Sequence, residues 1–189
     1  AAITPDEFRN LALSSYVYHI YAQSTGASIE FGYLASGSLA AGTAISGTSL
    51  VTDKANTTRM WDACVVLGTT DKIALAYIDN SGNDVILKTY AYGGSAGPLA
   101  APTTVEIDGA AADTASCITC FPLATDRVVV AYVNDSSEDI YAVVFNTLTG
   151  AVAYGPTLIL ARAGALTGLT GAACAHRGSA TGFVLFAED

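Results

Sequence analysis

The sequence has few positively charged residues, few charged residues of either sign and no long hydrophobic run. Eight Lys and Arg stand against 17 Asp and Glu, and charged residues make up 13% of the 189 positions. Eight scattered cations cannot build a basic surface of useful size, so nucleic acid and anionic membranes are poor partners. No segment approaches the roughly 18 continuous apolar residues of a membrane span. We therefore expect neither nucleic-acid binding nor membrane insertion.

Methionine and targeting signals are also scarce. The single methionine is Met60, and the N-terminus lacks the layout of a signal peptide. We expect the chain to be either a processed mature protein or a piece of a longer polypeptide. Half of the residues are hydrophobic (51%), which provides enough apolar surface for one packed domain and excludes a disordered chain.

An internal repeat of about 55 residues is the main positive signal. The segment 73–79 (IALAYID) has a close partner at 128–134 (VVVAYVN), and weaker partners lie at 17–23 and 182–188. Their aromatic anchors are 56, 55 and 54 residues apart; they are Tyr21, Tyr77, Tyr132 and Phe186. Each anchor is followed by an apolar residue and then by a polar one. This spacing predicts four copies of one structural unit.

The flanking segments recur in phase with the anchors. A polar turn and an alternating strand follow each of the two central anchors, and a short fourth strand comes later, at 103–107 and 157–160. A cysteine precedes three anchors by 12 or 13 residues; these are Cys64, Cys120 and Cys174. Short strands between turn signals indicate an all-β unit of four antiparallel strands, with the anchor strand buried on both faces.

This pattern resembles the β-propeller repeat proteins, whose blades are four-stranded antiparallel sheets. The hallmark motifs of the propeller subfamilies are not repeated here. The predicted fold is an all-β, propeller-like array in a single domain with repeats at 16–60, 61–115 and 116–171, and a partial repeat at 172–189. The number of strands is too small for a closed ring. The alternative is an ordinary β-sandwich.

One helix is expected, at about residues 5–13, capping the array within residues 1–15. Thr4 is a suitable N-cap, Pro5 suits the first helical position and Glu7 completes a capping box. Phe8 and Leu11 then fall on one helical face.

Two polar loops concentrate oxygen atoms that could bind calcium. In the loop 79–84, the candidate ligands are Asp79, Ser81, Asn83 and Asp84. Neither loop has the twelve-residue calcium pattern, and these residue types are also what a hairpin turn requires. We favour the turn, and we expect no metal or other cofactor.

The four cysteines and two histidines do not form a recognisable catalytic or zinc motif. Cys117 and Cys120 have the spacing of half a zinc ribbon, but no second pair exists. We interpret the three repeated cysteines as buried residues at equivalent positions on the inner strands, and one disulfide, using the extra Cys117, is the alternative. His19 and His176 are interpreted as structural, and we expect no enzyme activity.

Two glycosylation sequons begin at Asn56 and Asn134. Asn56 lies in a polar connection between repeats and is the better candidate. Asn134 opens a tight turn.

The predicted function is that of a non-enzymatic structural or interaction module, outside the cell or on the surface of a cell or virus particle. It would work through strand-edge association with further copies of itself, or as part of a larger propeller protein. The predicted assembly edge is the last anchor strand, Phe183, Val184, Leu185 and Phe186, because nothing follows it to complete a sheet. The alternative is a carbohydrate-binding or glycan-processing propeller that uses aromatic side chains such as Trp61, Tyr90, Tyr92 and Tyr154.

Overall fold

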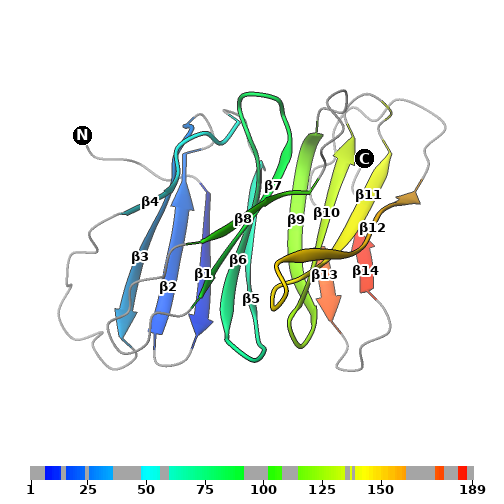
Figure 1. Cartoon of the computed structure of the whole chain (residues 1–189). Helices are drawn as coiled ribbons and strands as arrows, with labels where there is room; N and C mark the ends of the chain where they lie inside the picture. The colour runs from blue at the N-terminus through cyan, green and yellow to red at the C-terminus, as the bar shows by residue number, and fades with distance from the viewer. Residues whose placement is uncertain are drawn as a thin grey trace.

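The computed structural model of the chain is built from β-strands (Figure 1). It describes residues 7–13, 16–23, 26–35, 48–55, 60–91, 102–107, 115–134, 137, 139–160, 173–176 and 183–186. No helix occurs among these residues, and hence none that could cross a membrane. The predicted all-β fold is confirmed.

The strands form three antiparallel sheets of four strands and one of two. Sheet I consists of β1 (Glu7–Leu13), β2 (Tyr16–Ala22), β3 (Ile29–Ala35) and β4 (Thr48–Val51). Sheet II consists of β5 (Trp61–Val66), β6 (Lys72–Ile78), β7 (Val85–Ala91) and β8 (Thr103–Glu106). Sheet III consists of β9 (Ala115–Ala124), β10 (Arg127–Asn134), β11 (Ile140–Asn146) and β12 (Ala151–Leu160). Sheet IV consists of β13 (Ala173–His176) and β14 (Phe183–Phe186). In every sheet the strands lie side by side in chain order, so the predicted repeat of four-stranded antiparallel sheets is confirmed.

The predicted N-terminal helix is wrong. Residues 7–13 form β1, which pairs with β2 along its whole length, from Glu7 opposite Ala22 to Leu13 opposite Tyr16. Alternate residues face opposite sides, so Leu13 is buried while Phe8 is 61% exposed. An isolated helix of about nine residues is marginal in water even with good caps. A ladder of seven residue pairs between β1 and β2 is more favourable than such a helix, and it completes sheet I. Thr4 and Pro5, which carried the helix signal, lie outside the described residues.

The aromatic anchors occupy equivalent places in the register. Tyr21, Tyr77 and Tyr132 are each the sixth residue of the second strand, and they pair with Phe8, Trp61 and Ile118 on the first strand of their own sheets. Phe186, the fourth residue of β14, pairs with Ala173 on the first strand of sheet IV. The second strands of sheets II and III are buried on both faces except at their first residue, as the sequence predicted.

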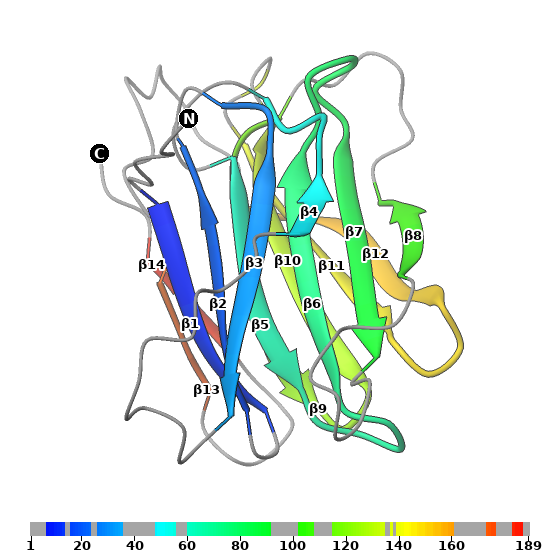
Figure 2. The same cartoon turned by 90° about the vertical axis from the view of Figure 1, so that its left-hand side faces the viewer.

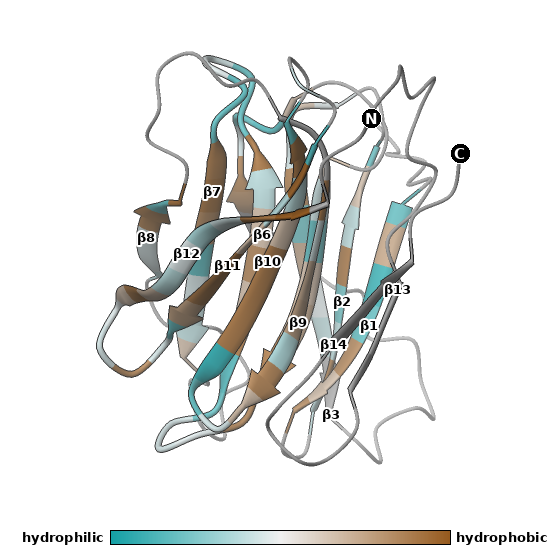
Figure 3. Ribbon diagram, turned by 90° about the vertical axis from the view of Figure 1, so that its right-hand side faces the viewer, coloured by the Kyte–Doolittle hydropathy of each residue, from teal (hydrophilic) through white to brown (hydrophobic). Residues whose placement is uncertain are grey.

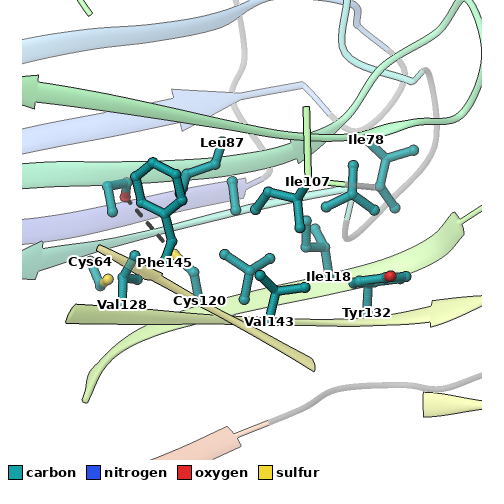
Figure 4. Packing of buried hydrophobic residues seen from close by; sticks show 14 of the residues in the cluster. Cys64, Ile78, Leu87, Ile107, Ile118, Cys120, Val128, Tyr132, Val143 and Phe145 are labelled. Atoms are coloured by element: carbon teal, nitrogen blue, oxygen red, sulfur yellow. Dashed lines mark hydrogen bonds between the residues drawn. The ribbon is translucent and has the colours of Figure 1, made fainter. Parts of the chain in front are cut away.

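The sheets pack face to face (Figure 1). They share two main hydrophobic cores. Tyr77 faces sheet I, together with Ile73 and Leu75, whereas Tyr132 faces sheet II. The core between sheets II and III is seen from close by in Figure 4. A smaller cluster that includes Val129 covers the other face of sheet III. The alternation of β6 between two cores explains why that strand is apolar at successive positions.

The first strands of the sheets are neighbours in space. β5 lies between β1 and β9, and β13 lies against β9. The fourth strands stand at the opposite margin of sheets I to III, where β4 and β8 are only four residues long (Figure 2). Side chains on the first strands can therefore connect several sheets.

Candidate functional site: the first strands and the outer edge

The carboxylate of Asp62 on β5 joins three sheets. It accepts hydrogen bonds from Arg9 Nε on β1 (2.6 Å), from Thr119 Oγ1 on β9 (2.8 Å) and from the backbone N–H of Cys120 (3.0 Å). The N–H of Ala63 donates to the same carboxylate at 2.9 Å. Asp62 is buried, and these donors replace the water that a buried carboxylate loses. The group fixes the sheets relative to each other.

The three side chains of this contact come from equivalent positions of the repeat. Arg9 pairs with Ile20, Asp62 with Ala76 and Thr119 with Ala131, and each partner directly precedes an anchor tyrosine. Sequence reasoning missed this contact. The available signal was a single carboxylate inside the small and apolar strand 61–66, WDACVV.

Trp61 is buried between sheets I and II and does not form a sugar-binding surface. Its indole Nε1–H donates to Glu7 Oε2 at 2.8 Å, and the guanidinium of Arg9 lies 5.8 Å from the ring centroid. Tyr90 is also buried, and its hydroxyl donates to the carbonyl of Leu50. Tyr92 lies outside the described residues. Of the three aromatic candidates that the structure describes, Tyr154 is the exposed one, at 68%.

The loop after β6 has the geometry of a hairpin turn. The carboxylate of Asp79 accepts hydrogen bonds from Ser81 Oγ (2.5 Å) and from the N–H groups of Gly82 and Asp84 (3.0 Å each). Burial raises the pKa of Asp79, but these hydrogen bonds outweigh it and leave the pKa below its ordinary value. The side chains of two calcium candidates, Asp79 and Ser81, therefore do come together, whereas Asp84 contacts Asp79 through its backbone N–H. However, the Asp79 oxygens are used by the turn, which supports the turn interpretation. Asn83 adopts a positive φ of 58°, which is common for asparagine in turns.

Of the two glycosylation candidates, the structure describes Asn134 but not Asn56. Asn134 is buried, and its Oδ1 accepts a hydrogen bond from the N–H of Ser137 at 3.1 Å. A buried, hydrogen-bonded amide is a poor acceptor for a bulky glycan. Asn56 lies outside the described residues, so its accessibility stays a prediction.

The cysteines lie on equivalent strands but not at equivalent residues. Cys64 stands three residues after the partner of Tyr77, whereas Cys120 stands two residues after the partner of Tyr132. Both side chains are buried in the core between sheets II and III as free thiols. Cys117 pairs with Val133 and Cys174 with Leu185, and their side chains lie outside those described. The expected residue-level equivalence is therefore wrong, and the one-residue offset brings two sulfur atoms into the same core.

Among the described side chains, neither His19 nor the hollow beside Tyr21 and Glu30 forms a recognisable reaction centre. His19 Nδ1 lies 2.5 Å from Asn10 Oδ1 on the neighbouring strand, and His176 pairs with Phe183. Among the described residues, no three His, Cys, Asp or Glu side chains are grouped as metal ligands would be. A hollow of about 120 Å³ lies beside Tyr21 and Glu30, whose side chains are hydrogen-bonded at 3.2 Å. Pockets for small molecules are usually about 300–1,000 Å³.

The outer strand of sheet III differs from its two counterparts. β12 has ten residues, whereas β4 and β8 have four each. Figure 3 shows the long β12 and the short β8. Its exposed large apolar side chains are Val152, Tyr154, Leu158 and Ile159. In the topology of the described strands, β12 pairs only with β11, so its other edge is open. An exposed and apolar edge strand can pair with another chain, and in β12 the segments on either side of Pro156 and of the register shifts against β11 are available for this.

The predicted assembly edge forms a strand. β14 pairs with β13 through four residue pairs, and the described part of the chain places no third strand beside it. The partial repeat expected over residues 172–189 stays a prediction, because the structure describes only 173–176 and 183–186 of that segment.

Comparisons with protein-family models, with curated proteins and with solved structures find no match to this chain.

Proposed function

We propose that this protein is a non-enzymatic structural or interaction module that works by pairing its strand edges. The partner is a further copy of the chain or the remainder of a larger polypeptide, and the location is extracellular or on the surface of a cell or virus particle. We further propose that sheets I to IV are successive blades of a propeller-like array.

The placement of the strands supports the propeller-like arrangement. The first strands β1, β5, β9 and β13 follow one another in space, as the inner strands of successive blades do. The anchor tyrosines keep one register, and Tyr77 and Tyr132 both face the preceding sheet. Tyr21 points away from sheet II, and the corresponding face of sheet I is where a further blade would pack.

The observation that carries the proposed function is the exposed strand β12. Its sequence, AVAYGPTLIL, has no ionisable group except the hydroxyl of Tyr154, in a chain whose net charge is −9. Two acidic molecules repel each other across most of their surfaces, and an uncharged strand is where two copies can approach with the smallest electrostatic cost. Pairing would also remove apolar side chains from water, at about 25 cal/mol for each Å² buried.

The test is the mass of the protein in solution at tens of micromolar. We expect the wild type to self-associate, because β12 and β14 both have open edges among the described strands. Ile159→Lys places a charge on β12 and should lower the associated fraction. Thr104→Lys places the same charge on the short, exposed strand β8 and serves as the matched control.

Deletion of residues 181–189 tests the second edge. If β14 is the dominant edge, the deletion abolishes assembly and Ile159→Lys has little effect. If β12 is the dominant edge, Ile159→Lys lowers the associated fraction and the deletion has little effect. A wild type that is a monodisperse monomer with an ordered C-terminal strand would refute edge pairing as the function of this chain.

Carbohydrate binding is the second candidate, and the exposure of Tyr154 favours it. An exposed aromatic ring can stack on the apolar face of a sugar. Binding on a glycan array that is lost in Tyr154→Ala and kept in Thr104→Lys would support this candidate. Trp61→Ala is not a suitable test, because that ring is part of the packing between sheets I and II.

A further inference from the structure

Two contacts place Cys120 beside Cys64, although the residues are on different sheets. The Sγ–H of Cys120 points to the carbonyl oxygen of Ala74 at 3.9 Å, and Ala74 is the residue directly opposite Cys64 in the ladder between β5 and β6. The backbone N–H of Cys120 donates to Asp62, two residues before Cys64 on the same strand. Cys120 is thus held against the part of sheet II that contains Cys64.

The surroundings of the two sulfur atoms are apolar and closed. Both cysteines belong to the core between sheets II and III, and both are buried (Figure 4). Burial, together with a hydrogen bond to the thiol of Cys64, raises the pKa of Cys120 well above its ordinary value. The two thiols therefore lie in one closed core, and that of Cys120 is protonated at neutral pH.

We infer that Cys64 and Cys120 form a disulfide that ties the first strand of sheet II to the first strand of sheet III. The residues are 56 positions apart (120 − 64), so the bond would join neighbouring repeats. It would lie next to the hydrogen bonds that Asp62 receives from sheet III. The structure described above is the dithiol form.

The oxidant required is a small-molecule disulfide such as oxidised glutathione. The thiolate of one cysteine attacks a glutathione sulfur, which forms a mixed disulfide and releases one glutathione thiolate. The other cysteine loses its proton and attacks the protein sulfur of the mixed disulfide, which forms the Cys64–Cys120 bond and releases the second glutathione. Two protein thiols are oxidised, one glutathione disulfide is reduced to two thiols, and the two protons end on the released glutathione.

The buried position determines when this reaction can occur. A raised pKa and the lack of access make direct oxidation of the folded protein slow. The bond should instead form while β5 and β9 are still accessible, during folding. Refolding in a glutathione redox buffer should therefore give the oxidised protein, whereas the folded dithiol form should oxidise much more slowly in the same buffer.

The experiment is refolding of the full chain from denaturant in mixtures of oxidised and reduced glutathione. Free thiols are then alkylated, and the protein is digested with trypsin without reduction. Trypsin produces one peptide, 60–72, that contains Cys64 and another, 89–127, that contains Cys117 and Cys120. We expect these peptides as one cross-linked species that lacks two hydrogen atoms and that separates on reduction.

Variants identify the second sulfur atom. Cys117→Ala should keep the cross-link, and Cys120→Ala should abolish it. Cys174→Ala is the control for the remaining cysteine. Recovery of peptide 60–72 with alkylated Cys64 from refolded wild type at every glutathione ratio would overturn the inference, and so would a cross-link that survives in Cys120→Ala. The wild-type measurement does not depend on whether a variant folds.

Discussion

Removal of the Asp62 carboxylate is the most direct test of how the sheets are held together. In Asp62→Ala, the hydroxyl of Thr119 and the N–H of Cys120 lose their acceptor in a buried place, while Arg9 loses an ion-pair partner. A hydrogen bond to a charged group contributes about 1.5–3 kcal/mol, and an orphaned buried donor costs about 1–3 kcal/mol. The side chain of Arg9 is 48% exposed, so the ion pair itself adds less than about 1 kcal/mol.

The expected loss for Asp62→Ala is therefore about 3–5 kcal/mol in the free energy of unfolding, because the two buried donors dominate and their terms are not fully additive. Asp62→Asn keeps the shape and one acceptor oxygen, and it should cost about 1–3 kcal/mol. Arg9→Ala should cost less than about 1 kcal/mol.

The assay is equilibrium unfolding in urea, monitored by tryptophan fluorescence, since Trp61 is the only tryptophan and precedes Asp62. Glu106→Ala is the matched control, because it removes an exposed carboxylate from β8 and should change the free energy of unfolding by less than about 0.5 kcal/mol. If Asp62→Ala is as stable as Glu106→Ala, the contact does not hold the three sheets together and the reasoning is refuted.

Two further predictions concern turns. Gly68→Ala should lower the free energy of unfolding by about 1–3 kcal/mol, because the new Cβ would lie 1.8 Å from Oδ1 of Asp126. Oδ1 of Asp126 accepts a hydrogen bond from the N–H of Thr69, and Oδ2 accepts one from its Oγ1, so this carboxylate is held in place. In urea unfolding, the double variant Gly68→Ala/Asp126→Ala should lose less than the sum of the single losses, and strict additivity would contradict this close contact. The lowered pKa of Asp79 means that its carboxylate stabilises the folded state. This contribution to the free energy of unfolding is complete above the ordinary carboxyl pKa of about 4 and is lost as the pH falls below that value. Asp79→Asn should therefore show a smaller loss of stability than wild type between about pH 5 and pH 2, and parallel pH profiles would argue against the effect.

The sequence by itself determined the repeat and the class of the fold. The spacing of Tyr21, Tyr77 and Tyr132 predicted their equivalent register, and the continuous apolar strands around Tyr77 and Tyr132 predicted burial on both faces. These features are local: a period of two in the side chains, turn residues between strands and a regular distance between units. The residues of the loop 79–84 likewise predicted a hairpin turn, because their side chains bind their own backbone.

Only the tertiary structure decided what the ends and edges of these units do. Residues 7–13 have a helical start signal, but the ladder with β2 and the burial of Leu13 make them a strand. The function of Asp62 depends on donors 53 to 58 residues away, and the meeting of Cys64 with Cys120 depends on a one-residue offset between two sheets. The exposure of β12 and the burial of Trp61 also depend on which neighbour each strand has. Local patterns fix how a strand is built, but contacts between distant parts of the chain fix which of its side chains remain available for another molecule.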